Sequence, residues 1–118
     1  MDILIVKKPW IDLILDGEKT WEIRGCDTKK RGRILLAESG TGLIRGSVEL
    51  HHTCRLLEED FETYRRKHQI PCQFEELPYK EPHIWWVRKP NRFEKPVPYK
   101  HPQGAVIWVK GEAAQWQT

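Results

Sequence analysis

Cysteines are few in this chain, and long hydrophobic runs are missing. The three cysteines, Cys26, Cys54 and Cys72, are odd in number and widely spaced, a pattern that argues against a disulfide framework. No apolar stretch approaches the roughly 20 residues of a membrane-spanning helix. Met1 and Asp2 lead straight into a short apolar run, without the basic start and cleavage site of a signal peptide. We therefore expect a cytoplasmic protein with reduced thiols and no membrane partner.

Several motifs of catalysis and metal binding are also missing. The sequence has no P-loop, no GxGxxG and no strand–turn–helix serine elbow. His51 and His52 with Cys54 come nearest to a metal cluster, but adjacent histidines in a strand point apart and CxxC or HxxxH spacing is absent. Neither a metal nor another cofactor is therefore expected. A two-histidine ribonuclease site stays open as an alternative, although nothing in the spacing pairs any two of the histidines. The five histidines are His51, His52, His68, His83 and His101.

Length and composition indicate a single globular domain. A chain of 118 residues suits one domain, and 39% hydrophobic with 31% charged residues is enough for one core. We place the domain at residues 1–111 and a loose tail at 112–118. Six tryptophans are more than a small core easily holds. Either one or two of them line a binding surface, or all six serve packing.

The net charge of +3 permits an anionic partner without demanding one. Basic side chains gather in three segments, at 29–33, 65–68 and 88–101. Two converging segments would form a groove that follows a phosphate backbone, whereas separate ones would only make the surface soluble. The candidates for backbone contacts are Lys29, Lys30, Arg31, Arg33, Arg88 and Arg92.

The apolar pattern predicts many short strands and two helices. Strands are expected at 3–6, 20–24, 33–38, 43–50, 83–89 and 105–109, with a further edge or bulged strand at 93–99. Helices are expected at 10–15, between Pro9 and a Gly17 cap, and at 58–68. Segments 39–42 and 90–91 read as turns, 25–32 as a loop and 71–82 as irregular. This order of elements predicts a small barrel flanked by helices.

A charged motif lies where the first helix gives way to the second strand. In a strand over 20–24, Glu22 and Arg24 project to one face and Trp21 and Ile23 to the other. One face can then anchor the core while the other presents fixed charges beside Lys19. The alternative is an ordinary solvated strand face with an exposed ion pair.

The motif Gly17-x-Lys19-x-x-Glu22-x-Arg24, after a helix of the Pro-Trp-x-x-Leu-Ile type at 9–14, resembles that of the ASCH domain. This family is named for its homology to the activating signal cointegrator 1 protein. The closing half, with Trp-Trp-Val at 85–87 and Lys-Pro-Val-Pro-Tyr at 95–99, is similar to small bacterial and phage ASCH proteins. The resemblance is weakest from about 54 to 80. It implies an α+β fold, a PUA-like small mixed β-barrel of about six strands flanked by two or three helices.

The resemblance also implies a cleft, faced by Lys19, Glu22 and Arg24, that binds RNA or nucleotide ligands. Some relatives are enzymes. One bacterial branch hydrolyses N4-acetylcytidine with the motif lysine, a threonine and a glutamate, and another member cleaves RNA. This chain keeps the lysine as Lys19 and has Glu22 in place of the threonine, while no motif locates the distal glutamate.

The charges of this trio favour binding over proton abstraction. Lys19 can act as a base or nucleophile only with a lowered pKa, whereas a neighbouring carboxylate raises it. Glu22 could accept a hydrogen bond from the exocyclic amine of a base while Lys19 and Arg24 contact a phosphate or carbonyl. The alternative is a structural bridge among the three that orients the loop.

Further ligand contacts are expected from Thr20, Trp85 and Tyr99, with only one of Trp85 and Trp86 able to face a given cleft. The leading expectation is an ASCH module that binds RNA, single-stranded nucleic acid or a modified nucleoside. One alternative is a hydrolase of N4-acetylcytidine-type nucleosides or of RNA, with Lys19 and Glu22 in the chemistry. Another is a protein-interaction adaptor with exposed tryptophans and prolines. The oligomeric state is left open.

Overall fold

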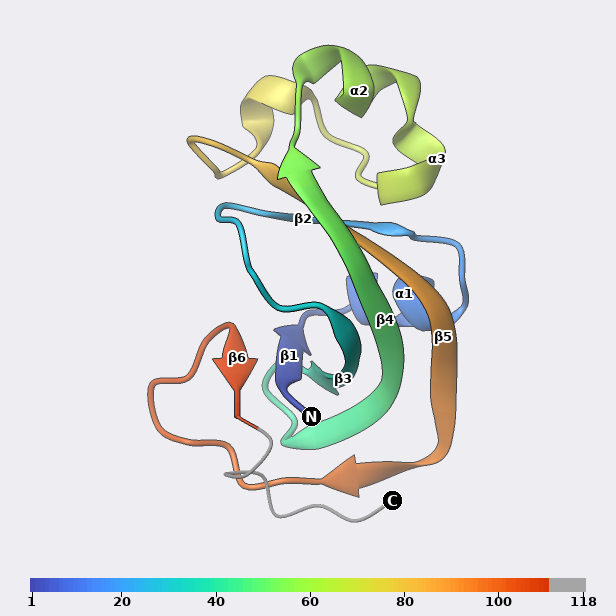
Figure 1. The fold of residues 1–118 in the computed structure, drawn as a ribbon, viewed down its shortest axis with the longest axis vertical. Coiled ribbons are helices and arrows are strands. Elements are labelled where there is room, and N and C mark those ends of the chain that lie inside the picture. Colours follow the sequence, from blue (N-terminus) through green and yellow to red (C-terminus); the bar gives the residue numbers. More distant parts are fainter. Residues whose placement is uncertain (111–118) are drawn as a thin grey trace.

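The computed structural model, which describes residues 1–110, is an α+β fold built on one six-stranded sheet (Figure 1). The strand order is β2-β5-β4-β3-β1-β6, with β1 and β3 parallel and the other pairs antiparallel. The strands are β1 (Ile3–Val6), β2 (Trp21–Arg24), β3 (Gly32–Glu38), β4 (Leu43–Arg55), β5 (His83–Pro98) and β6 (Trp108–Val109). The helices are α1 (Trp10–Leu15), α2 (Glu58–Thr63), α3 (Arg65–His68) and the 3-10 turn η1 (Phe74–Glu76). The predicted tail at 112–118 lies outside the described residues.

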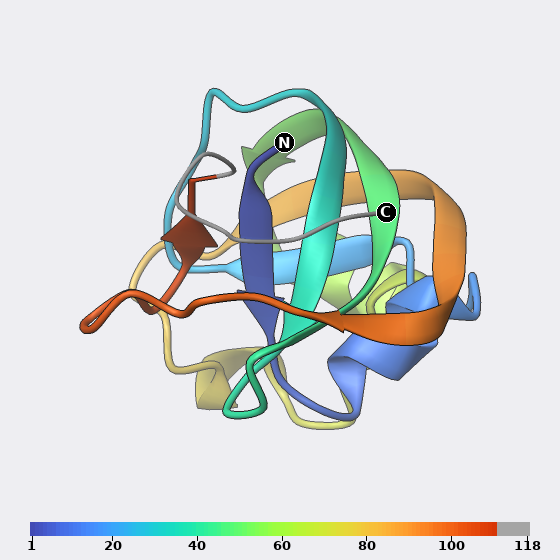
Figure 2. The same ribbon diagram turned by 90° about the horizontal axis from the view of Figure 1, so that it is seen from below.

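The sheet curls into a half-barrel because β4 and β5 are long, paired and strongly bent (Figure 2). Its concave side holds the main apolar cluster, to which α1 contributes Ile11 and Ile14 and the sheet contributes Leu36, Leu50 and Trp85. A second cluster lies under α2 and α3 at the other side of β2. The predicted class, a small mixed barrel of about six strands with two or three helices, is confirmed.

The predicted turn at 90–91 is wrong. The chain continues through it as the single strand β5, which stays paired with β4 on both sides. Glu49 pairs with Arg88 and Ser47 with Asn91, so two residues of β5 oppose Val48. Lys89 takes a positive φ of 52° at this bulge. A bulge accommodates Pro90, which has no N–H to give to a ladder, while bending the strand.

Three other boundaries differ from the sequence prediction. β4 continues past Leu50 to Arg55, because its far end pairs with the start of β5. The predicted helix at 58–68 is two short helices, since Tyr64 leaves helical geometry at φ −112° and ψ 41°. The predicted strand at 105–109 keeps only Trp108 and Val109, which pair with β1.

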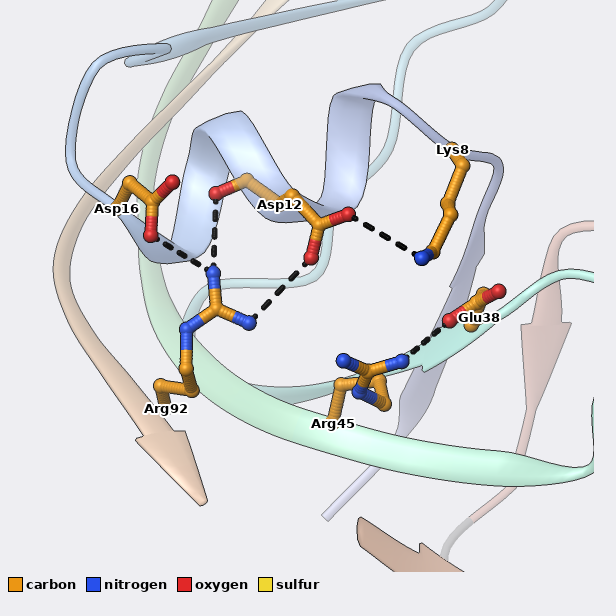
Figure 3. Close-up of polar contacts among 6 residues, drawn as sticks. All are labelled: Lys8, Asp12, Asp16, Glu38, Arg45 and Arg92. Carbon is orange, nitrogen blue, oxygen red and sulfur yellow. Dashed lines mark hydrogen bonds and ion pairs between the residues drawn. The ribbon is translucent and has the colours of Figure 1, made fainter. Parts of the chain in front are cut away.

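A salt-bridge network fixes α1 against β5 (Figure 3). The guanidinium of Arg92 donates to the side chain and carbonyl of Asp12, at 3.3 and 3.2 Å, and to the carboxylate of Asp16 at 2.8 Å. Gly46 of β4 lets the strands close up here, because a Cβ at this position would lie 2.5 Å from the carbonyl oxygen of Asn91. The end of α1, and the motif that follows it, are thereby held on the sheet.

Candidate functional site: a buried charged trio in a cleft

The turn after α1 positions the charged motif. Gly17 adopts φ 83°, a conformation that favours glycine, and ends the helix. The amide groups of Glu18 and Lys19 both donate to the carbonyl of Leu13 at 3.0 Å. Thr20 then joins two elements, donating its N–H to the Lys67 carbonyl and accepting from the Val87 N–H, each at 2.9 Å. The start of β2 is therefore fixed through its backbone, which leaves the side chains of the motif to form the site.

Lys19, Glu22 and Arg24 come together as the motif predicted. Glu22 accepts from Arg24 Nε at 2.8 Å through one oxygen, and its other oxygen lies 3.9 Å from Lys19 Nζ. Lys19 Nζ donates to the carbonyl oxygen of His68 at 2.5 Å, and Arg24 donates to that of Ile5 at 2.8 Å. Lys19 is 1% exposed and Glu22 is 5% exposed. The alternative of a solvated strand face is thus wrong, because two of the three charged side chains are almost fully buried.

The trio forms part of the wall of a cleft of about 380 Å³. This volume lies within the roughly 300–1,000 Å³ of ordinary small-molecule pockets. The indole of Trp10 lies 4.8 Å from Lys19 Nζ and also lines the cleft. The segment after α3 also lines the cleft, through Ile70, Cys72 and residues 77–79. The cleft thus combines three largely buried charges with apolar and aromatic walls.

Burial sets the pKa of Lys19. Removal of the ammonium from water lowers its pKa from 10.5 to about 8, even though the carboxylate of Glu22 raises it and Arg24 lowers it by a smaller amount. The charges alone predict that Glu22 keeps the pKa of Lys19 high. In the folded protein desolvation outweighs that attraction, so a substantial fraction of Lys19 is neutral in mildly alkaline solution.

The structure does not bring Thr20, Trp85 or Tyr99 into the cleft wall. Trp85 is fully buried in the main core, where it donates to the carbonyl of Cys26 at 2.9 Å. The centroid of its ring lies 5.7 Å from the guanidinium carbon of Arg24, a cation–π contact that helps to hold Arg24 in place. Tyr99 is buried in a separate cluster and its hydroxyl contacts His101 Nδ1 at 2.7 Å. The aromatic cleft residues are instead Trp10 and Tyr79.

Sequence reasoning missed both aromatic residues of the cleft. Trp10 lies in the helix segment of the family motif, but its spacing is equally typical of a core residue. Tyr79 lies in the irregular segment 77–82, where no periodicity indicates a direction. Its position depends on Gly25, since a Cβ there would lie 2.8 Å from the Tyr79 ring. Such a contact between segments far apart in the chain becomes visible only in the fold.

The predicted backbone-binding cations do not line the cleft. Arg33 and Arg88 lie on the outer face of the sheet instead, where Arg33 donates to the carbonyl of Lys89 at 2.7 Å and Arg88 pairs with Glu49 at 2.5 Å. Arg31 donates to the hydroxyl of Thr53 at 2.7 Å. Lys29 is exposed. Lys30 pairs with Asp2 at 2.6 Å. The guanidinium of Arg92 is engaged in ion pairs with Asp12 and Asp16 at α1 (Figure 3). The three basic segments therefore do not form one groove with the cleft.

Within residues 1–110, no three His, Cys, Asp or Glu side chains gather where they could hold a metal ion. No helix in the same range has the length and apolar character needed to cross a membrane.

The chain is thus a small α+β half-barrel with a charged cleft beside the turn after its first helix. The family model of the ASCH domain matches residues 4–97. Solved structures of an ASCH protein from Zymomonas mobilis share the fold at 14% sequence identity. A serine-to-alanine mutant of that protein has a TM-score of 0.70, with 95% of this chain and 89% of that chain covered, and a tyrosine-to-phenylalanine mutant has 0.69, with 95% and 91%. No curated protein matches the sequence. The chain belongs to the ASCH domain family.

Proposed function

We propose that the cleft binds RNA or a nucleotide, with Lys19, Glu22 and Arg24 as ligand contacts. The observation that carries this proposal is the buried trio in a cleft of about 380 Å³ with aromatic walls. Buried charges that are already ordered by hydrogen bonds cost little further ordering when a ligand binds. They also discriminate strongly, since a ligand that leaves one of them unpaired is penalised.

The roles of the three groups follow from their chemistry. The carboxylate of Glu22 can accept from the exocyclic amine of a base, because an ionised carboxylate is an acceptor only. Arg24 and Lys19 can donate to a carbonyl or phosphate oxygen. Trp10 and Tyr79, which both line the cleft, supply faces on which a base or sugar can stack.

Calorimetric titration with the four ribonucleoside monophosphates and with a mixed single-stranded RNA pool tests this proposal. We expect Glu22→Gln to reduce or change the preference among the four bases. We expect Arg24→Gln to lower the affinity for phosphate-bearing ligands more than the affinity for nucleosides. Lys95→Gln, an exposed cation near the far end of β5, is the matched control. Unchanged affinity in both cleft variants would reject the cleft as the binding site.

A second candidate function is hydrolysis, and the lowered pKa of Lys19 is the specific observation in its favour. A lysine with a pKa near 8 can accept a proton at a useful rate near neutral pH, which an ordinary lysine does poorly. The candidate substrates are N4-acetylcytidine-type nucleosides and RNA. Glu22 would then hold the substrate or share the proton.

The test is turnover of N4-acetylcytidine and of the RNA pool by the parent protein and by Lys19→Met. Product that disappears in the variant would establish an enzyme with Lys19 in the chemistry. Absence of product, combined with salt-sensitive RNA binding by the parent, would favour the binding function alone. Salt-sensitive binding indicates contacts with phosphates, whereas the affinity for a neutral nucleoside depends little on salt.

A further inference from the structure

A second group of aromatic and basic side chains lies outside the cleft, on the outer face of the sheet. The group, here called the outer patch, consists of Trp21, His51, His52, Tyr64, Lys67, Trp86, Arg88, Lys89 and Arg33. Residues on neighbouring strands that pair directly project to the same face. Trp86 pairs with Trp21 on one side and with His52 on the other, so the three rings form a row across β2, β5 and β4.

Ring contacts hold the aromatic part of the patch together. Trp86 lies 5.2 Å from Trp21 and 5.7 Å from His52 between ring centroids, and Tyr64 lies 5.3 Å from Trp21. The ammonium of Lys67 lies close to the rings of Trp21, Tyr64 and Trp86, at 5.9, 5.8 and 5.8 Å. One cation is thereby placed among three rings, of which Tyr64 is 42% exposed.

Basic residues continue the patch along the same face. Arg88, two residues after Trp86 on β5, projects to the same side. Partial burial and, to a smaller extent, the nearby charge of Arg88 lower the pKa of His51. Arg33 on β3 donates to the Lys89 carbonyl at 2.7 Å.

One carboxylate of the patch offsets part of this positive charge. Glu49 is paired with Arg88 and lies 3.9 Å from Lys89. The cations of the patch are Lys67, Arg88, Lys89 and Arg33, and they outnumber this carboxylate. The patch therefore keeps a positive balance.

Two indole N–H groups of the patch are buried in a way that lowers stability. The indole N–H groups of Trp21 and Trp86 are buried and have no hydrogen-bond acceptor among residues 1–110. A buried donor without an acceptor costs stability, and such groups in a folded protein ask for an explanation. A functional demand for two large rings at this place would provide one.

We propose that the outer patch is a second contact surface for single-stranded nucleic acid, with a base stacked on Tyr64 and phosphates held by Lys67, Arg88 and Lys89. Aromatic faces interleaved with cations are the combination that binds single strands without base-specific hydrogen bonds. The proposal goes beyond the cleft function and does not rest on it. The patch shares no residue with the wall of the cleft.

Fluorescence anisotropy with labelled twelve-residue oligouridylate and oligothymidylate tests the patch. The variant Tyr64→Ala with Lys67→Gln should weaken binding of one or both strands about tenfold, because a stacking ring and a phosphate contact are lost together. The plot of log affinity against log salt should become shallower by about 0.7 for the lost phosphate contact. Tyr64→Phe keeps the ring and should bind like the parent protein.

Two controls separate this surface from general charge and from the cleft. Lys95→Gln removes one exposed cation elsewhere and should change affinity by less than about twofold. Arg24→Gln addresses the cleft, which is read out with a nucleoside monophosphate. If Arg24→Gln and Glu22→Gln both leave monophosphate binding intact, the cleft proposal fails and the patch proposal stands. Equal affinity of Tyr64→Ala with Lys67→Gln and the parent for both oligonucleotides would overturn the patch proposal.

Discussion

Two carboxylates of this protein have nearly the same neighbours and very different surroundings. Glu22 in the cleft lies 2.8 Å from an arginine Nε and 3.9 Å from a lysine Nζ, and Glu49 in the outer patch lies 2.5 and 3.9 Å from the same two kinds of group. The side chains of Lys19 and Arg24 are only 1% and 15% exposed, whereas those of Lys89 and Arg88 are 68% and 51% exposed. Similar geometry with unequal burial shows what desolvation contributes.

In the cleft, desolvation turns a simple ion pair into a tuned site. Water no longer screens the charges, so each depends on its neighbours and Lys19 shifts its pKa to about 8. In the outer patch water screens the same kind of contact, and the residues remain available to an external phosphate. The cleft is therefore suited to selecting a small group, and the patch to holding a backbone.

The largest expected difference is in stability. Glu22→Ala leaves two largely buried cations without their carboxylate and should lower the free energy of unfolding by about 3–5 kcal/mol. Glu49→Ala leaves solvated cations and should lower the free energy of unfolding far less. Urea unfolding with a constant m-value measures both changes. Equal losses in the two variants would show that burial does not distinguish the two carboxylates.

The next prediction concerns the titration of Lys19. An NMR titration of its side-chain carbon should show a midpoint near pH 8. Glu22→Gln should move this pKa lower, since the carboxylate raises it, and Arg24→Gln should move it higher, since the guanidinium lowers it. A midpoint near 10.5 in the parent protein would contradict the desolvation argument.

The same shift has a consequence for stability that can be measured separately. Between pH 8 and 10.5 the unfolded chain binds the Lys19 proton while the folded chain has released it. The contribution of Lys19 to the free energy of unfolding therefore rises with pH in this window, by at most about 1.4 kcal/mol per unit. The difference between the parent and Lys19→Met isolates this contribution, because the other groups titrate in both.

The motif itself was predictable because it depends on local rules. A helix that ends at a glycine, followed by a strand with alternating sides, brings Glu22 and Arg24 to one face next to Lys19. What the sequence could not provide was the depth of burial, since this depends on the carbonyl of His68 and on Tyr79, both distant in the chain. For the same reason the stacking roles of Trp85 and Tyr99 were misjudged, because both rings fill the core.

The fold shows a similar division between local and distant information. The first helix, the hairpin of β3 and β4 and the irregular segment before β5 follow from periodicity and turn residues. The continuity of β5 through Pro90 does not, because a proline and an asparagine normally indicate a turn. Residues 89–90 form a bulge only because β5 pairs with β4 on both sides of them. The sequence of one strand does not show which strand it pairs with.

An effect of intermediate size is expected from His68, which connects the cleft to the core. Its ring is stacked on Phe61 at 4.1 Å, and its Nδ1 accepts from the amide of Ile70 at 2.9 Å. Burial lowers the pKa of His68 below its usual 6.5, opposed by the carbonyl of Phe61 and aided by the charge of Lys19. The folded protein thus holds a neutral ring, and the free energy of unfolding should decrease as the pH falls below about 6.5.

Acid should therefore loosen the cleft before it unfolds the outer patch. Protonation of Nδ1 removes the acceptor for the Ile70 amide, and Ile70 lines the cleft. The protection factor of the Ile70 amide against hydrogen exchange should fall as the pH drops below the ordinary histidine pKa of about 6.5, while those of amides in the centre of β4 change less. Uniform loss of protection would instead indicate a global effect.

The smallest expected effect is the coupling of the exposed pair itself. A double-mutant cycle with Glu49→Gln and Arg88→Gln should give only a small coupling energy at low salt, because both groups are hydrated when separated. Raising the ionic strength toward about 1 M, where the screening length falls to about 3 Å, should remove most of it. The matching cycle with Glu22→Gln and Arg24→Gln should change far less with salt, since ions do not enter the buried pair. If salt weakened both couplings equally, the cleft trio would behave as a solvated surface group, and the distinction between a selecting cleft and a holding patch would be lost.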